Sequence, residues 1–139
     1  MDSKQLPWII LMTHGEAGAS LKKSAEMIIG EMEDVYCLSL MEGRDPADYA
    51  EELKKLLVDA PDRTIILTDL YGGTPCNMAS VFATQKEYIV LSGLNLAMLI
   101  EAESQRAALT GEELTECIQA AAVDGIKDIR KIMRERREK

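Results

Sequence analysis

Four short apolar runs, each followed by a segment with helical spacing, constrain the fold of this chain more than any other feature. The runs expected to form strands cover residues 8–12, 35–40, 64–68 and 88–92. Four strands that are each followed by a helix require crossover connections, which are right-handed and leave the strands parallel. We therefore expect a doubly wound α/β fold, with a mainly parallel four-stranded sheet and helices on both faces.

Local signals mark where the intervening helices begin and end. After the first run, Leu21, Ala25 and Ile28 share one helix face, and Gly30 is placed to end that helix. The other candidate boundaries are N-cap residues or prolines in a first helical turn: Asp45, Pro46, Thr74, Pro75, Asn95 and Thr110. Thr110 also opens a sequence with the spacing of a capping box.

Length and composition fit one domain. The chain has 139 residues, of which 47% are hydrophobic, enough for one sizeable core and too few for two ordinary domains. We find no internal repeat at a fixed period and no low-complexity linker. Residues 1–139 are therefore expected to form a single domain, with a basic tail from about residue 133.

Charge and cysteine content argue against several classes of function. The net charge of −8 disfavours nucleic acid as the main partner, because phosphate backbones select basic surfaces. The apolar runs are too short to span a membrane, and the N-terminus lacks the pattern of a signal peptide. The three cysteines are odd in number and widely spaced, which signals neither a disulfide framework nor a zinc site. These features favour a cytoplasmic protein with reduced thiols.

The C-terminal segment allows more than one interpretation. Residues 130–139 carry six basic and two acidic side chains, and such a charge run is usually a solvated helix end or a frayed terminus. At the start of this segment, Ile126, Ile129 and Ile132 have helical spacing, whereas a strand would place Ile129 on the face opposite the other two. Periodicity alone favours a helix here.

The only histidine of the chain, His14, stands at the C-terminal end of the first apolar run and precedes Gly15. Ligands of open α/β sheets bind outside the carboxyl ends of the strands, so this position suits a reactive side chain. The alternative is a loop histidine with a satisfied hydrogen bond and no catalytic role.

A second motif follows the third apolar run. Asp69 stands at the end of that run, and the glycines Gly72 and Gly73 precede Thr74 at the start of a predicted helix. This turn is a plausible cradle for an anion such as phosphate, although a purely structural turn with Thr74 as N-cap explains the same residues. If the first and third strands are neighbours, His14 and Asp69 face each other across the crevice at the switch point.

A histidine beside a carboxylate suits nucleophilic chemistry. A carboxylate that accepts the Nδ1–H bond fixes the tautomer and leaves the lone pair of Nε2 free to attack an electrophile. We find no serine nucleophile motif, no Cys/His dyad spacing, no P-loop lysine and no carboxylate cluster for Mg²⁺ beside it. The electrophile must therefore arrive already activated, and we expect no cofactor and no metal.

Four motifs, in order and spacing, resemble the mannose-family IIA domains of the bacterial phosphoenolpyruvate-dependent sugar phosphotransferase system. The resemblance covers about residues 8–132. The motifs are Thr13-His14-Gly15 and residues 24–30, 69–77 and 92–99.

The resemblance implies a phosphoryl relay. His14 would accept a phosphoryl group from the histidine-containing phosphocarrier protein and pass it to a IIB component, for sugar uptake and phosphorylation. Asp69 would orient His14, and Gly72, Gly73 and Thr74 would lie beside the phosphoryl group. The membrane would be reached only through the transporter complex.

The resemblance also implies an assembly. Residues 126–132 would form a short antiparallel edge strand exchanged between two subunits of a homodimer. On this point the family resemblance and the helical periodicity disagree.

Two other functions stay open at this stage. A regulatory interaction module, whose phosphorylation state is the signal, would use the same histidine without sugar flux of its own. A weaker alternative makes Asp69 the phosphoacceptor, but the end of the first run lacks the further acidic residues that would hold Mg²⁺.

Overall fold

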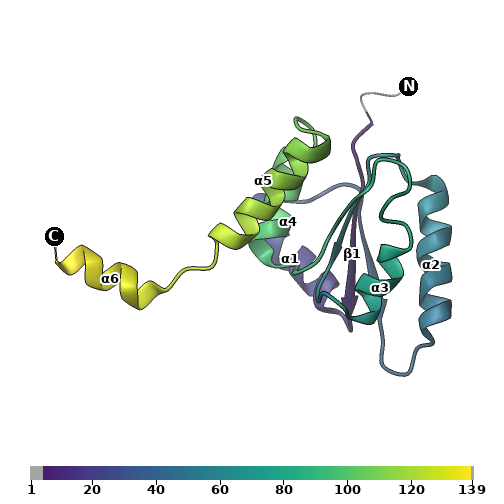
Figure 1. Cartoon of the computed structure of the whole chain (residues 1–139), viewed down its shortest axis with the longest axis horizontal. Coiled ribbons are helices and arrows are strands. Elements are labelled where there is room, and N and C mark those ends of the chain that lie inside the picture. Colours follow the sequence, from purple (N-terminus) through teal and green to yellow (C-terminus); the bar gives the residue numbers. More distant parts are fainter. Residues whose placement is uncertain (1–4, 139) are drawn as a thin grey trace.

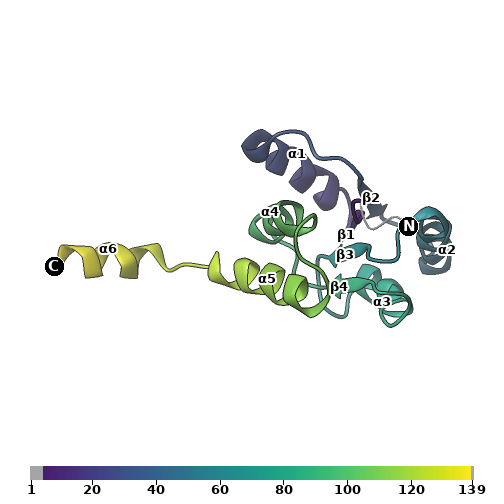
Figure 2. The same ribbon diagram turned by 90° about the horizontal axis from the view of Figure 1, so that it is seen from above.

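The computed structural model describes residues 5–138 and contains one parallel sheet between two layers of helices (Figures 1 and 2). The strands are β1 (Ile9–His14), β2 (Val35–Leu40), β3 (Ile65–Thr68) and β4 (Ile89–Leu91). The helices are α1 (Ala17–Ile29), α2 (Pro46–Asp59), α3 (Thr74–Ser80), α4 (Leu96–Gln105), α5 (Gly111–Asp124) and α6 (Ile129–Arg137). The strand order is β2-β1-β3-β4, with every neighbouring pair parallel. The predicted doubly wound fold is confirmed.

Two hydrophobic cores lie on opposite faces of the sheet. Along β1, Ile9 and Leu11 point to the face covered by α1, α4 and α5, while Ile10 and Met12 point to the face covered by α2 and α3. All four side chains are fully buried. Because both faces of a parallel sheet are covered, its strands appear in the sequence as continuous apolar runs rather than as alternating patterns.

The register of the central strands positions the candidate site. Met12 pairs with Thr68, the last residue of β3, and His14 pairs with Leu40, the last residue of β2. β1 therefore extends two residues beyond β3. Since side chains alternate along a strand, His14 shares a face with Ile10 and Met12, and this is the face that carries α3.

The helix boundaries follow the sequence signals with two differences. The side chains of Asp45 and Asn95 accept hydrogen bonds from the backbone N–H groups of Ala47 and Met98, as expected for N-caps. Thr74, by contrast, is the first residue of α3, whose N-cap is Gly73. Thr110 precedes α5, but its side chain forms no capping hydrogen bond, so the capping box is not formed.

A buried arginine ties the amino ends of β1 and β2 to the end of α4. Arg106 is only 2% exposed, and its guanidinium donates hydrogen bonds to the carbonyl oxygens of Pro7, Glu33 and Asp34. It also pairs with the carboxylate of Glu103 at 2.6 Å. Buried charges persist in proteins when they are paired in this way, so Arg106 has a structural role at the end of the sheet opposite His14.

The predicted C-terminal edge strand is wrong. Residues 126–128 belong to no strand, and α6 begins at Ile129. The side chain of Asp128 accepts a hydrogen bond from the N–H of Lys131, an N-cap that starts a helix. Helical spacing puts Ile129, Ile132 and Met133 on one face, which a strand would not do, so the interpretation from periodicity is the correct one.

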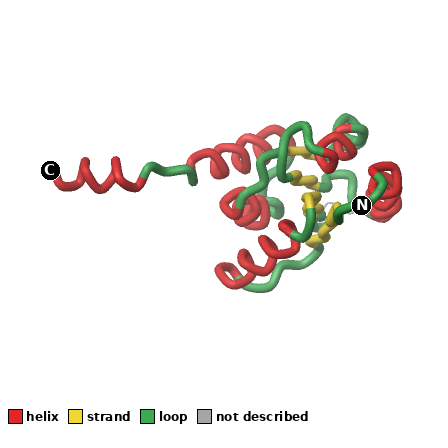
Figure 3. Tube along the Cα trace, turned by 90° about the horizontal axis from the view of Figure 1, so that it is seen from below, coloured by secondary structure: helices red, strands yellow, loops and turns green. Residues whose placement is uncertain are grey.

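α6 extends away from the rest of the chain, beyond a short loop after α5 (Figures 1 and 3). None of its residues is buried. Among residues 5–138, no helix combines the length and the apolar character needed to cross a bilayer.

Candidate functional site

His14 and Asp69 meet at the carboxyl edge of the sheet, as the sequence predicted. The Nδ1 atom of His14 lies 3.0 Å from Oδ2 of Asp69, and the backbone N–H of His14 donates to the same oxygen at 2.9 Å. Because a carboxylate can only accept, Nδ1 carries the hydrogen in this pair, and Nε2 keeps its lone pair. Two hydrogen bonds to one oxygen fix both the backbone and the ring of His14.

The side chains of His14 and Asp69 differ in their exposure to solvent. The His14 side chain is 49% exposed and the Asp69 side chain 23%. Oδ1 of Asp69 is buried and accepts no hydrogen bond from the residues that the structure describes. The ring of His14 is therefore accessible to a large partner, whereas the carboxylate that orients it is shielded behind it.

Gly73 provides the space beside the histidine ring. A Cβ atom at this position would lie 2.8 Å from Cε1 and 3.4 Å from Nε2 of His14, and the first of these distances is shorter than van der Waals contact allows. Gly73 thus has a steric reason to be glycine. Gly72 has a conformational one, since its φ of +84° lies in the left-handed region.

The turn that carries these glycines is held by its own hydrogen bonds. The N–H of Gly73 donates to the carbonyl of Leu70 at 3.0 Å. Asn77 binds both glycine carbonyls, because its Nδ2 donates to Gly72 at 3.2 Å and its backbone N–H to Gly73 at 2.9 Å. Sequence reasoning missed this role of Asn77, although its position one helical turn after the glycines was a usable signal.

Thr74 lies at the first position of α3 and is partly exposed. Its hydroxyl takes part in none of the hydrogen bonds between residues 5–138. A hydroxyl beside Gly73 that is not used for capping is available to a bound group.

The loop after His14 is fixed by its buried neighbour Thr13. The Oγ1 atom of Thr13 accepts a hydrogen bond from the N–H of Gly18 at 2.9 Å and donates to the carbonyl of Gly15 at 3.3 Å. The N–H of Gly15 donates to Leu40 at 2.7 Å, which continues the pairing of β1 with β2. Thr13 is a second supporting residue that the sequence did not identify as such.

Exposed apolar side chains lie on the loops that end β2 and β3, next to the histidine. They are Met41, Leu70 and Tyr71, with exposed fractions of 48%, 60% and 85%. Met41 directly follows the pairing partner of His14, and the other two directly follow Asp69. We call these three residues the apolar rim; such a surface is suited to contact with a protein.

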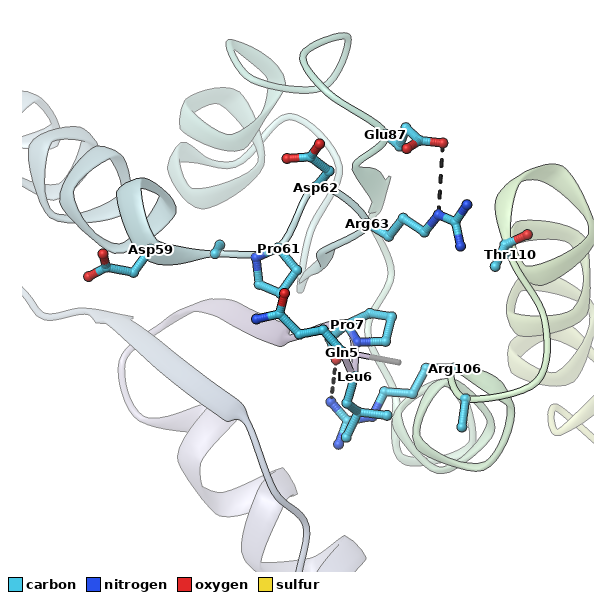
Figure 4. A pocket seen from close by; sticks show the side chains of 12 residues that line it. Gln5, Leu6, Pro7, Asp59, Pro61, Asp62, Arg63, Glu87, Arg106 and Thr110 are labelled. Carbon is cyan, nitrogen blue, oxygen red and sulfur yellow. Dashed lines mark hydrogen bonds and ion pairs between the residues drawn. The ribbon is translucent and has the colours of Figure 1, made fainter. Parts of the chain in front are cut away.

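A cavity of about 750 Å³ lies at the other end of the sheet (Figure 4). Its lining includes Pro7, Arg63 and Glu87, which precede β1, β3 and β4. The buried Arg106 contacts Pro7 there. This cavity is separate from the His14 site, because the two lie at opposite ends of the strands. Within the described residues, no three histidine, cysteine or carboxylate side chains are grouped to bind a metal.

Fold and site together define a doubly wound α/β domain whose candidate reactive group is one histidine held by a carboxylate. The family described as "EIIA-man: PTS system fructose IIA component" matches residues 8–119, which include every residue of the site. The chain belongs to this family of IIA components of the phosphotransferase system.

Individual proteins show the same similarity. The chain is 32% identical over 131 residues to the PTS system mannose-specific EIIAB component of Escherichia coli strain K12, covering 84% of this chain and 41% of that protein. It therefore spans less than half the length of that relative. It is 30% identical over 115 residues to the PTS system fructose-specific EIIA component of Bacillus subtilis, with 81% of this chain and 79% of that protein covered.

A solved structure has the same fold. It is the phosphotransferase system component EIIA from Streptococcus agalactiae, which superposes with a TM-score of 0.84 at 32% sequence identity. The superposition covers 91% of this chain and 99% of that one. The sheet and its helices are thus shared with an experimentally determined IIA component.

Proposed function

We propose that this chain is a phosphoryl carrier of a sugar phosphotransferase system. It accepts a phosphoryl group on His14 from the histidine-containing phosphocarrier protein and passes it to a IIB component, which phosphorylates the incoming sugar. The observation that carries the proposal is the double hydrogen bond of His14 to one oxygen of Asp69. Membership in the IIA family supports it.

The proposed transfer needs little from the protein besides orientation. The lone pair of Nε2 attacks the phosphorus of the donor's phosphohistidine; a new N–P bond forms, and the bond to the donor nitrogen breaks with its electron pair leaving on that nitrogen. The imidazole of His14 gains positive character during the attack, and the Asp69 carboxylate on Nδ1–H stabilises it. In the second step, a nucleophile of the IIB component attacks the phosphorus. The N–P bond to His14 then breaks, and its electron pair returns to Nε2.

Gly72, Gly73 and Thr74 form the proposed binding place of the phosphoryl group. Gly73 leaves open the space that a Cβ atom would fill beside Nε2, and the free hydroxyl of Thr74 supplies a hydrogen bond to a phosphoryl oxygen. The Gly73 N–H is engaged with Leu70, so the contribution of Gly73 is space rather than a donor. Gly72 supplies the left-handed turn that brings Thr74 to this position.

The apolar rim, Met41, Leu70 and Tyr71, fits docking of the two protein partners beside a half-exposed histidine. Because donor and acceptor use the same histidine in turn, both must approach this edge of the sheet. The relatives' names mention mannose, fructose and sorbose, so we propose a hexose as the sugar finally phosphorylated. A carrier that exchanges phosphoryl groups with these two partners works in the cytoplasm, so this is the location we propose for the chain.

Incubation with phosphoenolpyruvate and the two general phosphotransferase proteins should add one phosphoryl group per chain, measured by intact mass. The group should survive alkali and be lost in acid, because phosphohistidine has this stability. Rapid loss in alkali would identify an acyl phosphate and contradict the proposal in favour of Asp69 as the acceptor. Onward transfer to sugar, on addition of a IIB component and its membrane partners, separates a carrier from a regulatory module.

We also propose that the chain forms a homodimer. Two features support this: among residues 5–138, β4 has a neighbouring strand on only one of its edges, and Val123 near the end of α5 and Ile126 in the loop after it are 64% and 76% exposed. An open strand edge beside exposed apolar side chains invites pairing with a second copy.

The dimer is tested by replacing the exposed apolar residues Val123, near the end of α5, and Ile126, in the loop after it. The double variant Val123→Asp, Ile126→Asp should have half the mass of the unchanged chain in light scattering, because a buried charge opposes the interface. Val58→Asp is the matched control, since Val58 is 78% exposed on α2 at the other side of the molecule. An unchanged mass in the double variant would contradict this interface.

A further inference from the structure

The four loops that follow the strands at the carboxyl edge of the sheet carry a single cationic side chain. These loops cover residues 15–16, 41–45, 69–73 and 92–95. Their one basic residue is Arg44, and their acidic residues are Glu16, Glu42, Asp45 and Asp69, which gives the loops a net charge of −3. A phosphoryl group on His14 would add up to about two further negative charges at this edge. Because like charges repel, a cation that reaches this group would stabilise the phosphorylated form.

The β2–α2 loop keeps Arg44 near the end of β2, the strand that pairs with His14. His14 lies opposite Leu40, the last residue of β2. A turn follows, in which the N–H of Arg44 donates to the carbonyl of Met41 at 3.1 Å. The Cα atoms that close such a turn are less than about 7 Å apart, so Arg44 does not extend away from the strand end. In Figure 1 this loop lies at the same end of the sheet as the tip of β1 and the start of α3.

The buried Tyr49 shows that the charges of Arg44 and Asp69 share one neighbourhood. The guanidinium carbon of Arg44 lies 6.0 Å from the centre of the Tyr49 ring. Burial raises the pKa of the Tyr49 hydroxyl, and the carboxylate of Asp69 raises it further. Arg44 acts on the same pKa in the opposite direction. Since charges shift a pKa in this way from nearby, the arginine and the carboxylate that orients His14 both lie close to this ring.

Arg44 has a partner that it can leave. Its Nη1 atom lies 2.7 Å from Oε1 of Glu52, yet this oxygen accepts no aligned hydrogen bond from residues 5–138. The side chains of Arg44 and Glu52 are 34% and 43% exposed. Ion pairs at such exposure contribute little to stability, because water solvates both charges. Arg44 can therefore exchange Glu52 for a group with more negative charge.

We propose that Arg44 leaves Glu52 when His14 is phosphorylated and binds the phosphoryl oxygens. The planar guanidinium offers parallel N–H donors that fit two phosphoryl oxygens at once. The glycine turn and Thr74 offer the phosphoryl group space and a hydroxyl but no charge, so Arg44 supplies the charge compensation that they lack. The inference rests on the proposed function, in which His14 accepts the phosphoryl group.

The equilibrium of phosphoryl exchange tests the proposal on the full chain. Phosphorylated donor protein is mixed with the chain until the phosphorylated fraction of each, measured by intact mass, no longer changes. Arg44→Gln should shift this equilibrium about fivefold toward the donor, because a partly exposed ion pair contributes up to a factor of about five. Arg44→Lys keeps the charge and should recover most of the difference. Lys55→Gln is the matched control on the exposed face of α2, and should shift the equilibrium less than about twofold, because distant surface charges are screened.

Two further measurements separate charge compensation from structural support. Glu52→Gln removes the competing carboxylate and should shift the equilibrium toward the phosphorylated chain, opposite to the effect of Arg44→Gln. In phosphorus NMR, the pKa of the phosphoryl group on His14 should be higher in Arg44→Gln than in the unchanged chain, because a nearby cation favours the more highly charged form. Damage to the structure would not produce opposite shifts in the two variants.

The outcomes distinguish this inference from the proposed function. A wild-type chain that accepts no phosphoryl group would refute the proposed function and the inference with it. If the wild-type chain is phosphorylated but Arg44→Gln changes neither the equilibrium nor the pKa of the phosphoryl group, the inference alone is wrong. Slower transfer from the donor at an unchanged equilibrium would also overturn it, since Arg44 would then contact the donor protein rather than the phosphoryl group.

Discussion

His14→Ala is expected to accept no phosphoryl group at all. His14 is the only histidine of the chain, and its Nε2 is the one ring nitrogen left with a free lone pair by the hydrogen bond to Asp69. With the ring removed, no other side chain among residues 5–138 combines a nucleophilic nitrogen with an orienting carboxylate at the carboxyl edge of the sheet. Intact mass after incubation with phosphoenolpyruvate and the two general proteins measures the result.

The variant should remain folded, which makes the loss interpretable. The His14 side chain is half exposed and lies outside both hydrophobic cores, so truncation leaves no cavity. Surface changes of this kind alter stability by about 0.5 kcal/mol or less, and the melting temperature should stay close to that of the unchanged chain. A phosphoryl group retained by folded His14→Ala would refute the assignment and leave Asp69 as the first acceptor to test.

The positions of His14 and Asp69 could be predicted from the sequence because they follow from topology. Apolar runs that alternate with helices require parallel strands, and the carboxyl ends of parallel strands lie at one edge. Both residues directly end such a run, and β1 and β3 are indeed neighbours. The pairing of their side chains at 3.0 Å is therefore a consequence of strand order rather than of any local motif.

Details that depend on distances could not be predicted. The sequence shows two consecutive glycines, but only the structure separates the left-handed turn at Gly72 from the steric requirement at Gly73. It also reverses the roles of Gly73 and Thr74, since Gly73 is the N-cap and the Thr74 hydroxyl is left free. Cap preferences identify the neighbourhood of a helix start and not the residue that forms it.

The C-terminal segment illustrates a conflict between two kinds of inference. The family resemblance implied an exchanged strand, and the spacing of the apolar residues indicated a helix. The helix is observed, and its cap at Asp128 is a local interaction within three residues. Local signals act within the chain itself, whereas an exchanged strand gains its hydrogen bonds only from another subunit.

The Asp69→Asn variant should fold normally and accept the phosphoryl group far more slowly. An amide can place its oxygen where Oδ2 lies and still accept from the backbone and ring of His14. Its NH₂ group then occupies the position of Oδ1, which is buried without a partner among the described residues, and the unsatisfied donor is costly. In the reverse orientation the NH₂ group faces the backbone N–H of His14 and favours the wrong tautomer of the ring.

In either orientation, the asparagine lacks the negative charge with which Asp69 stabilises the imidazole during the attack. The corresponding change in a serine protease lowers the rate on the order of 10⁴-fold, which we take as the upper bound here. Rapid-quench measurement of transfer from the phosphorylated donor gives the rate. Asp62→Asn serves as the matched control, because Asp62 precedes β3 at the opposite end of the sheet and, among residues 5–138, its carboxylate pairs only with the exposed Lys86. A wild-type rate in Asp69→Asn, or an equal loss in Asp62→Asn, would show that Asp69 does not orient His14 for the reaction.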